Sequence, residues 1–171
     1  PTGTNKILFY RDGRTATVSG MFSAPGTFML ATNGKVDASL DAAWLRPTPL
    51  GERRRTFTAD ASTQALLALF ALAHVPEART AAVVGQGSGM TSHLLLGSGR
   101  LTSLTTLEIE PAMITGSNVF YPANRRVFED ARSRFVIEDA RSFLAATPNR
   151  YDLILSEPSN PWVSGVASLF T

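Results

Sequence analysis

The chain has 171 residues, of which 44% are hydrophobic, and its formal net charge is +2. This length and composition suit one globular domain with a core, or one domain with a small addition, and so small a charge argues against a nucleic acid as the partner. The sequence has no cysteine, its two histidines lack the spacing of metal ligands, and no apolar run reaches about 18 residues, so we expect no disulfide, no metal and no transmembrane segment.

Residues 1–44 predict a small antiparallel β domain. Two pairs of β-prone segments flank the turn sequences Asp12-Gly13 and Asn33-Gly34, which is the pattern of β-hairpins. Residues 45–60 contain prolines, a glycine and an arginine run without a helical or strand period, so we interpret them as a linker.

Residues 61–171 predict an α/β domain. The first helix is expected to begin at Asp60 as N-cap and to end before Pro76. Its apolar face is expected to contain Leu66, Leu67, Leu69, Phe70 and Ala73. Strand-like runs then alternate with helical segments, which favours a parallel sheet covered by helices on both faces. The predicted strands are 81–84, 101–107, 134–137 and 151–155, and the predicted helices are 90–96, one from Pro111, and 140–146.

The most specific local pattern is the apolar run 81–84, which breaks into Gly85, Gly87 and Gly89 before a helical segment. Glycine allows the sharp turn and lets a ligand approach the bare backbone. Glu108 follows Gly89 by nineteen residues at the end of the next strand, where an acid grips a ribose diol. Met90 stands where the dinucleotide fingerprint needs glycine, so a nucleoside cofactor fits better.

Polar residues follow all four predicted strands, whose carboxyl ends should meet at one edge of the sheet. After the glycine loop and Glu108, the third strand leads to Asp139, and the fourth leads to the segment 156–162, which two prolines stiffen. Asp139 has an equally good interpretation as the N-cap of the helix 140–146.

Taken in order, these motifs resemble those of the spermidine synthase (polyamine aminopropyltransferase) family. The resemblance implies a Rossmann-like S-adenosylmethionine methyltransferase fold, here with a truncated sheet, and the first hairpins are similar to that family's small β domain. The matching motifs are residues 84–89, 107–110, 137–140 and 151–161.

Residues 156–170 resemble a bacterial branch whose members are often fused to membrane-spanning segments. We therefore expect a chain cut from a longer protein at both ends, whose last strand would leave an exposed sheet edge. The protein would be cytoplasmic or a soluble domain of a membrane-anchored parent, and a homodimer stays open.

The resemblance also implies roles for single residues. Decarboxylated S-adenosylmethionine, or S-adenosylmethionine itself, would be bound without a metal, with Glu108 on the ribose and Asp139 with Ala140 on the adenine edge. Glu157 falls at the family's catalytic aspartate. The expected cofactor-binding residues are Gly85, Gln86, Gly87, Gly89, Glu108, Ile109, Asp139 and Ala140, and a small amine or polyamine would be bound by Gln64, Asn160 and Trp162.

Three departures from the family pattern fall on the amine side. Ser88 and Asn160 replace aspartates, and Thr63 replaces a tyrosine. Because carboxylates hold a cationic amine and take its proton, we expect a degenerate acceptor site. Two alternatives stay open: methyl transfer from S-adenosylmethionine, because residues 160–162 resemble the loop of amino methylases, and a non-catalytic sensor of adenosyl ligands.

Overall fold

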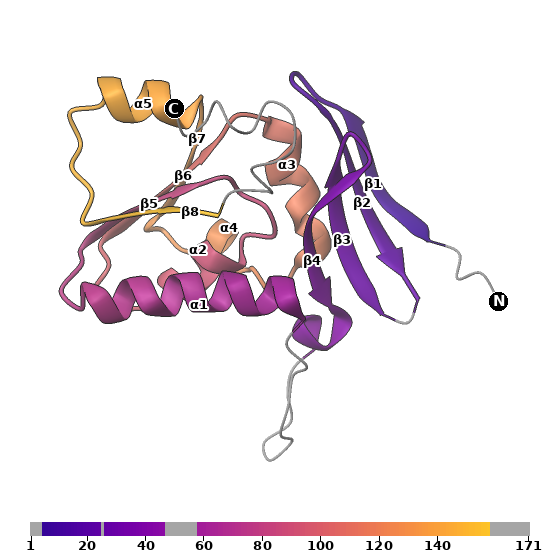
Figure 1. Ribbon diagram of the computed structural model, residues 1–171, viewed down its shortest axis with the longest axis horizontal. Helices are drawn as coiled ribbons and strands as arrows, with labels where there is room; N and C mark the ends of the chain where they lie inside the picture. The colour runs from indigo at the N-terminus through magenta and orange to yellow at the C-terminus, as the bar shows by residue number, and fades with distance from the viewer. Residues whose placement is uncertain (1–4, 25, 47–57, 158–171) are drawn as a thin grey trace, which may run out of the picture.

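The fold combines an antiparallel sheet with a parallel sheet (Figure 1). The computed structural model describes residues 5–24, 26–46 and 58–157. The antiparallel sheet contains, in chain order, β1 (Lys6–Asp12), β2 (Thr17–Ser23), β3 (Thr27–Thr32) and β4 (Lys35–Asp41). Both predicted hairpins are confirmed, although the first turn spans residues 13–16, between β1 and β2, and is not centred on Asp12-Gly13.

The second sheet is parallel, as the alternation of strands and helices predicted. It contains β5 (Thr80–Val84), β6 (Ser103–Glu108), β7 (Ser133–Ile137) and β8 (Leu153–Ser156) in the order β7-β6-β5-β8. Within the described residues β8 is therefore an edge strand. The register pairs Val84 with Leu107 and with Ser156, so the strands end level and the residues that follow them form a row.

In residues 5–24, 26–46 and 58–157, five α-helices and two short 3-10 helices connect the strands. They are η1 (Ala42–Leu45), α1 (Ala59–His74), α2 (Met90–Leu95), α3 (Pro111–Gly116), η2 (Ser117–Phe120), α4 (Arg126–Glu129) and α5 (Ala140–Ala146). The prediction of Asp60 as N-cap of α1 was wrong, because Thr58 Oγ1 accepts the Ala61 N–H at 3.3 Å and starts the helix earlier. The segments η1, η2 and α4 were not predicted, since four residues carry no helical period.

The buried face of α1 also differs from the prediction, except at Leu67, which packs against the core. Leu66, Leu69 and Phe70 are 47%, 55% and 60% exposed, whereas the small residue Ala68 packs in a core with Leu95 and other residues of the parallel sheet and α2. Alanine side chains let the helix approach the sheet closely, and this close packing prevailed over the burial of larger side chains.

A second core lies between the antiparallel sheet and helices of the parallel-sheet half. Leu30 and Leu40 of the antiparallel sheet pack with Met113 and Phe120, which follow β6 in the chain. A Cβ on Gly116 would lie 2.9 Å from Leu30 Cδ1, so α3 touches the antiparallel sheet closely (Figure 1). The antiparallel sheet is thereby fixed beside the glycine loop, while the division into domains at residues 45–60 stays a prediction.

Candidate nucleoside and amine site

The glycine loop after β5 has the backbone geometry that the sequence predicted. Gly85, Gly87 and Gly89 have φ angles of 86°, 47° and 79°, a region that residues with side chains rarely adopt. The Gly85 N–H donates to the Leu107 carbonyl at 2.8 Å, and a Cβ added to Gly85 would meet nothing within 4 Å. The loop thus turns sharply and offers open backbone at its first glycine.

Glu108 lies directly beneath this loop. Its Oε2 accepts the Gln86 N–H at 2.8 Å, and its Oε1 accepts the Glu110 N–H at 3.0 Å. Burial raises the pKa of Glu108 above its ordinary value, while hydrogen bonds from three backbone N–H groups oppose the rise. Each oxygen keeps acceptor capacity beyond these bonds, so the carboxylate is oriented at the strand end without being saturated.

Buried amides support the loop from within. Gln86 Nε2 donates to Ser117 Oγ at 2.9 Å, and Asn124 Nδ2 donates to the Ser88 carbonyl at 2.8 Å and the Ser117 carbonyl at 2.9 Å. Gln86 Oε1 and Asn124 Oδ1 are buried without a hydrogen bond among the described residues. Asn124 was missed, because a single asparagine between short helical turns gives no sequence signal.

Gln64 and Ser88 contact each other. Gln64 is buried in α1, and its Oε1 accepts a hydrogen bond from Ser88 Oγ, which itself accepts the Met90 N–H at 3.1 Å. Thr63 is exposed, and its hydroxyl donates to the Ala59 carbonyl at 3.0 Å. Two of the three residues that depart from the family pattern therefore make internal hydrogen bonds.

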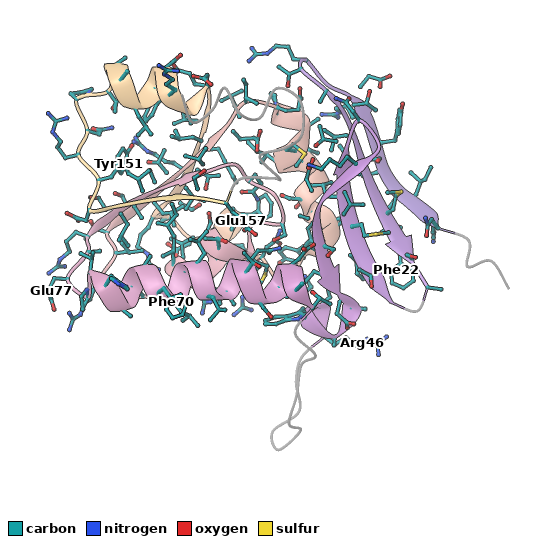
Figure 2. The ribbon with its side chains drawn as sticks, in the orientation of Figure 1. Phe22, Arg46, Phe70, Glu77, Tyr151 and Glu157 are labelled. Carbon is teal, nitrogen blue, oxygen red and sulfur yellow. The ribbon has the colours of Figure 1, made fainter. Side chains whose placement is uncertain are left out.

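Glu157 follows β8 in the same row as Gly85, and Figure 2 shows it between the end of β8 and α1. Partial desolvation raises the pKa of Glu157, and the negative charge of Asp60 raises it further. Asp60 belongs to the first turn of α1, one turn before Gln64, and accepts a hydrogen bond from Ser39 Oγ of β4.

No ion pair forms with Glu157 or Asp60 in the part of the chain that the structure describes. Asp60 was missed as a site residue because it was interpreted as a helix cap. Its position four residues before Gln64, hence on the same helix face, was the available signal.

The other predicted cofactor residues lie at the same edge. Asp139 Oδ1 accepts the Ser142 N–H at 2.8 Å, which confirms the capping interpretation, and this backbone hydrogen bond lowers the pKa of Asp139. Ala140 is the first residue of α5, and Ile109 is 46% exposed beside Glu108. Contact of these residues with adenine stays a prediction. Asn160 and Trp162 lie outside the described residues.

Residues 5–24, 26–46 and 58–157 contain neither a candidate metal site nor a candidate membrane span. No three His, Asp or Glu side chains gather as metal ligands would, and no helix has the length and apolarity to cross a bilayer. His93 instead contacts Arg126, with 3.0 Å between Nε2 and the guanidinium Nη1.

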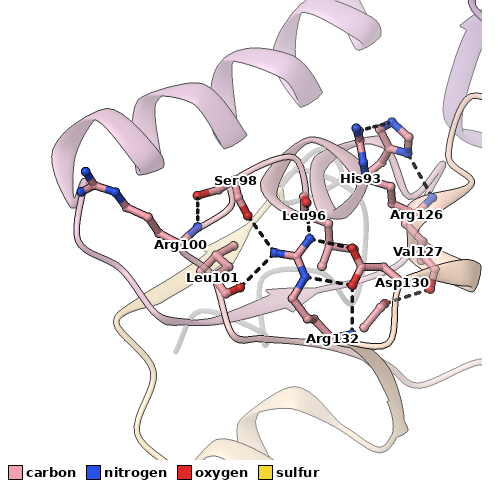
Figure 3. Close-up of polar contacts among 10 residues, drawn as sticks. His93, Leu96, Ser98, Arg100, Leu101, Arg126, Val127, Asp130 and Arg132 are labelled. Atoms are coloured by element: carbon pink, nitrogen blue, oxygen red, sulfur yellow. Dashed lines mark hydrogen bonds and ion pairs between the residues drawn. The ribbon is translucent and has the colours of Figure 1, made fainter.

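A second charged cluster, Asp130 with Arg132, lies away from the strand ends (Figure 3). It is saturated, because each nitrogen of the guanidinium donates to an acceptor. The Arg132 guanidinium donates to Asp130 Oδ1 at 2.9 Å and Oδ2 at 2.6 Å. It also donates to the carbonyls of Leu96, Ser98 and Leu101. The hydrogen bonds that the Arg132 side chain and backbone N–H donate to Asp130 lower the pKa of Asp130 to about 2.

The parallel sheet, with a glycine loop after its first strand and an acid after its second, defines a Rossmann-like fold of the methyltransferase type. A family model described as the spermine/spermidine synthase domain matches residues 61–171. The chain belongs to the spermine/spermidine synthase family, which confirms the resemblance seen in the sequence.

Similar proteins include two curated enzymes. The polyamine aminopropyltransferase of Thermococcus onnurineus is 28% identical over 90 residues, and polyamine aminopropyltransferase 1 of Pseudomonas aeruginosa is 29% identical over 96 residues. Each alignment covers 53% of this chain but only 32% and 34% of the two relatives. The chain thus spans about a third of their length.

Solved structures of similar fold include a spermidine synthase in complex with the transition state analogue AdoDATO, with a TM-score of 0.72 over 92% of this chain and 48% of that one. The spermidine synthase from Thermotoga maritima has a TM-score of 0.71 over 91% of this chain and 48% of its own. Both are 13% identical in sequence, so they establish the fold alone.

Proposed function

We propose that the protein is a transferase that moves an aminopropyl group from decarboxylated S-adenosylmethionine to an amine. The observation that carries the proposal is the strand register, which aligns the glycine loop, Glu108 and Glu157 at one edge of the parallel sheet. Family membership and the names of the relatives support the same reaction.

The adenosyl side of the site fits a sulfonium nucleoside. The open backbone at Gly85 would accommodate the chain attached to sulfur, and the free acceptor capacity of Glu108 would bind the ribose hydroxyls. Asp139, Ala140 and the exposed Ile109 would contact the adenine. The bound nucleoside supplies an electrophilic carbon next to its sulfonium, and the chain's residues orient that carbon toward the amine.

The amine side would use Glu157 as general base, with Asp60 beside it. An alkylammonium has a pKa of about 10, so it must lose a proton before its nitrogen can attack. Glu157 takes that proton, and the nitrogen lone pair forms a bond to the aminopropyl carbon. The carbon–sulfur bond breaks with its electrons on sulfur, and methylthioadenosine leaves. The raised pKa of Glu157 favours this proton transfer.

The pair of carboxylates suits a cationic acceptor such as a diamine or polyamine. Neither Glu157 nor Asp60 has an ion pair within the described residues, and each is expected to attract an ammonium by on the order of 1 to 4 kcal/mol. Ser88 already donates to Gln64. We infer that Asp60 supplies part of the negative charge of the missing aspartates. We also infer that the site binds an amine more weakly than a site with the full family pattern would.

A non-catalytic sensor is the second candidate. The hydrogen bond from Ser88 Oγ to Gln64 Oε1 favours it, because these two polar groups bind each other and not an amine. Calorimetric titration with decarboxylated S-adenosylmethionine, S-adenosylmethionine, methylthioadenosine and putrescine separates the candidates. Tight binding of the decarboxylated ligand, and of putrescine once methylthioadenosine is bound, supports the transferase. Adenosyl binding without amine binding favours the sensor, preference for S-adenosylmethionine favours methyl transfer, and no adenosyl binding contradicts all three.

A homodimer and a membrane-anchored parent protein also remain predictions. Sedimentation equilibrium of the purified chain tests the first, because a dimer would give twice the molar mass of the monomer.

A further inference from the structure

Glu110 is a buried acid with no part in the proposed chemistry, and it joins the two sheets. Its Oε2 accepts the Thr15 N–H at 2.6 Å and the Thr15 hydroxyl at 2.8 Å, and its Oε1 accepts the Ala112 N–H at 3.0 Å. Thr15 belongs to the turn between β1 and β2. A carboxylate of the parallel-sheet half therefore holds a turn of the antiparallel sheet.

The same residue contacts the acid that would bind the ribose. The Glu110 N–H donates to Glu108 Oε1 at 3.0 Å, and Glu108 Oε2 accepts the Gln86 N–H at 2.8 Å. Thr15 bonds the side-chain carboxylate of Glu110, and Glu108 bonds its backbone N–H, so the residue Glu110 links the turn to Glu108 and Gln86. We call this set of contacts the turn-to-loop relay, since it runs from the β1–β2 turn to the glycine loop.

The turn approaches Glu110 so closely that only glycine fits beside it. A Cβ on Gly13 would stand 2.2 Å from Glu110 Oε1, and the Gly13 N–H closes the turn on the Ala16 carbonyl at 2.9 Å. Although burial opposes it, the donors from Ala112 and Thr15 lower the pKa of Glu110. Glu110 is therefore held as a carboxylate that accepts all of these bonds.

We infer that Glu110 is a positioning residue that orients Glu108 and thereby couples the β1–β2 turn to adenosyl binding. The identity of the ligand rests on the proposed function, whereas the relay itself rests on the contacts above. Coupling of this kind is reciprocal. A bound nucleoside therefore stabilises the turn, just as the turn stabilises the site.

The relay is tested first without ligand, by amide hydrogen exchange of the full chain. Thr15→Val removes the hydroxyl donor but keeps the backbone donor. We expect the Gln86 and Glu110 amides to exchange about fivefold to tenfold faster, because Glu110 loses a bond that holds it. Thr17→Val is the matched control, since its hydroxyl donates to Asp12 at 2.8 Å in the same hairpin. Unchanged exchange at Gln86 in Thr15→Val would overturn the inference.

The coupling to binding is tested with methylthioadenosine as the probe. Thr15→Val should weaken its binding about fivefold, Thr17→Val should not, and the ligand should slow exchange of the Thr15 amide in the wild-type chain. Glu110→Gln is the second variant and should weaken binding further, because an amide nitrogen cannot accept the bonds that a carboxylate oxygen accepts. Equal affinity in Thr15→Val, Glu110→Gln and wild type would overturn the coupling.

Failure of the proposed function would look different. If the wild-type chain bound no methylthioadenosine, the nucleoside site would be refuted. The unliganded exchange of Gln86 would still decide whether the turn holds the glycine loop.

Discussion

Two charged clusters in this protein differ in what surrounds them. Arg132 and Asp130 neutralise each other, and three carbonyls take the remaining donors of the guanidinium. Glu157, at the end of β8, feels the negative charge of Asp60 in α1, and neither acid has an ion pair among the described residues. The pKa of Asp130 falls to about 2, whereas the pKa of Glu157 rises.

The direction of the pKa shift distinguishes a carboxylate that is paired within the fold from one that has no partner there. An acid paired with an arginine is stabilised as the anion by the fold itself. Burial raises the pKa of Glu157, the charge of Asp60 raises it further, and a bound cation would oppose both effects. A perturbed carboxylate therefore indicates a binding site here only where its counter-charge is missing.

The largest effect is expected from Glu157→Gln, which removes the proposed base. Turnover should fall about a thousandfold, while the affinity for methylthioadenosine stays within about twofold. Glu138→Gln is the matched control, because Glu138 is an exposed acid that follows β7 of the same sheet. A Glu157→Gln enzyme with more than about a tenth of the wild-type rate would exclude Glu157 as the base.

At the saturated cluster, Arg132→Lys should reduce stability and leave the site intact. An ammonium cannot reach Asp130 and three carbonyls together, so the free energy of unfolding should drop by about 3 kcal/mol. Arg100→Lys is the control, since Arg100 forms an exposed ion pair with Glu77, and should cost less than about 1 kcal/mol. Denaturant titration measures both changes. Weaker methylthioadenosine binding at unchanged stability would contradict the structural role of Arg132.

Glu108→Ala should remove most of the adenosyl affinity. The ribose hydroxyls would lose a charged acceptor, and the Gln86 N–H would lose its partner, so binding of methylthioadenosine should weaken about a hundredfold. Calorimetry measures the change. Affinity equal to that of the wild-type chain would show that Glu108 only supports the glycine loop.

The smallest effect is expected from Asp60→Asn. The charge of Asp60 raises the pKa of Glu157, so its removal lowers that pKa, and the acid limb of the pH–rate profile should move to lower pH. The KM of the amine should rise about threefold, because one charge near the ammonium is lost. An acid limb that does not move, with an unchanged KM, would separate Asp60 from the site.

Prediction from sequence succeeded where a general rule of the fold applies. The row of Gly85, Glu108 and Glu157 follows from the shared edge of parallel strand ends, and Asp139 follows from helix capping. The buried face of α1 was predicted correctly at Leu67 but wrongly at Leu66, Leu69 and Phe70, because hydrophobicity does not reveal that Ala68 packs in the core.

The contacts that were missed all depend on tertiary packing. Glu110 accepts hydrogen bonds from Thr15 across 95 positions of sequence, and the charge of Asp60 acts on Glu157 because α1 packs against β8. No local period or spacing encodes such pairs. The same holds for Ser88 and Gln64, whose mutual hydrogen bond changes how a departure from the family pattern is interpreted.

The most direct test is the product of the reaction. Full-length protein supplied with decarboxylated S-adenosylmethionine and putrescine should release methylthioadenosine and spermidine in equal amounts, as chromatography with mass detection would show. Release of neither product under conditions where the wild-type protein binds both substrates would contradict aminopropyl transfer. It would leave a nucleoside-binding protein whose unpaired acids serve another cation.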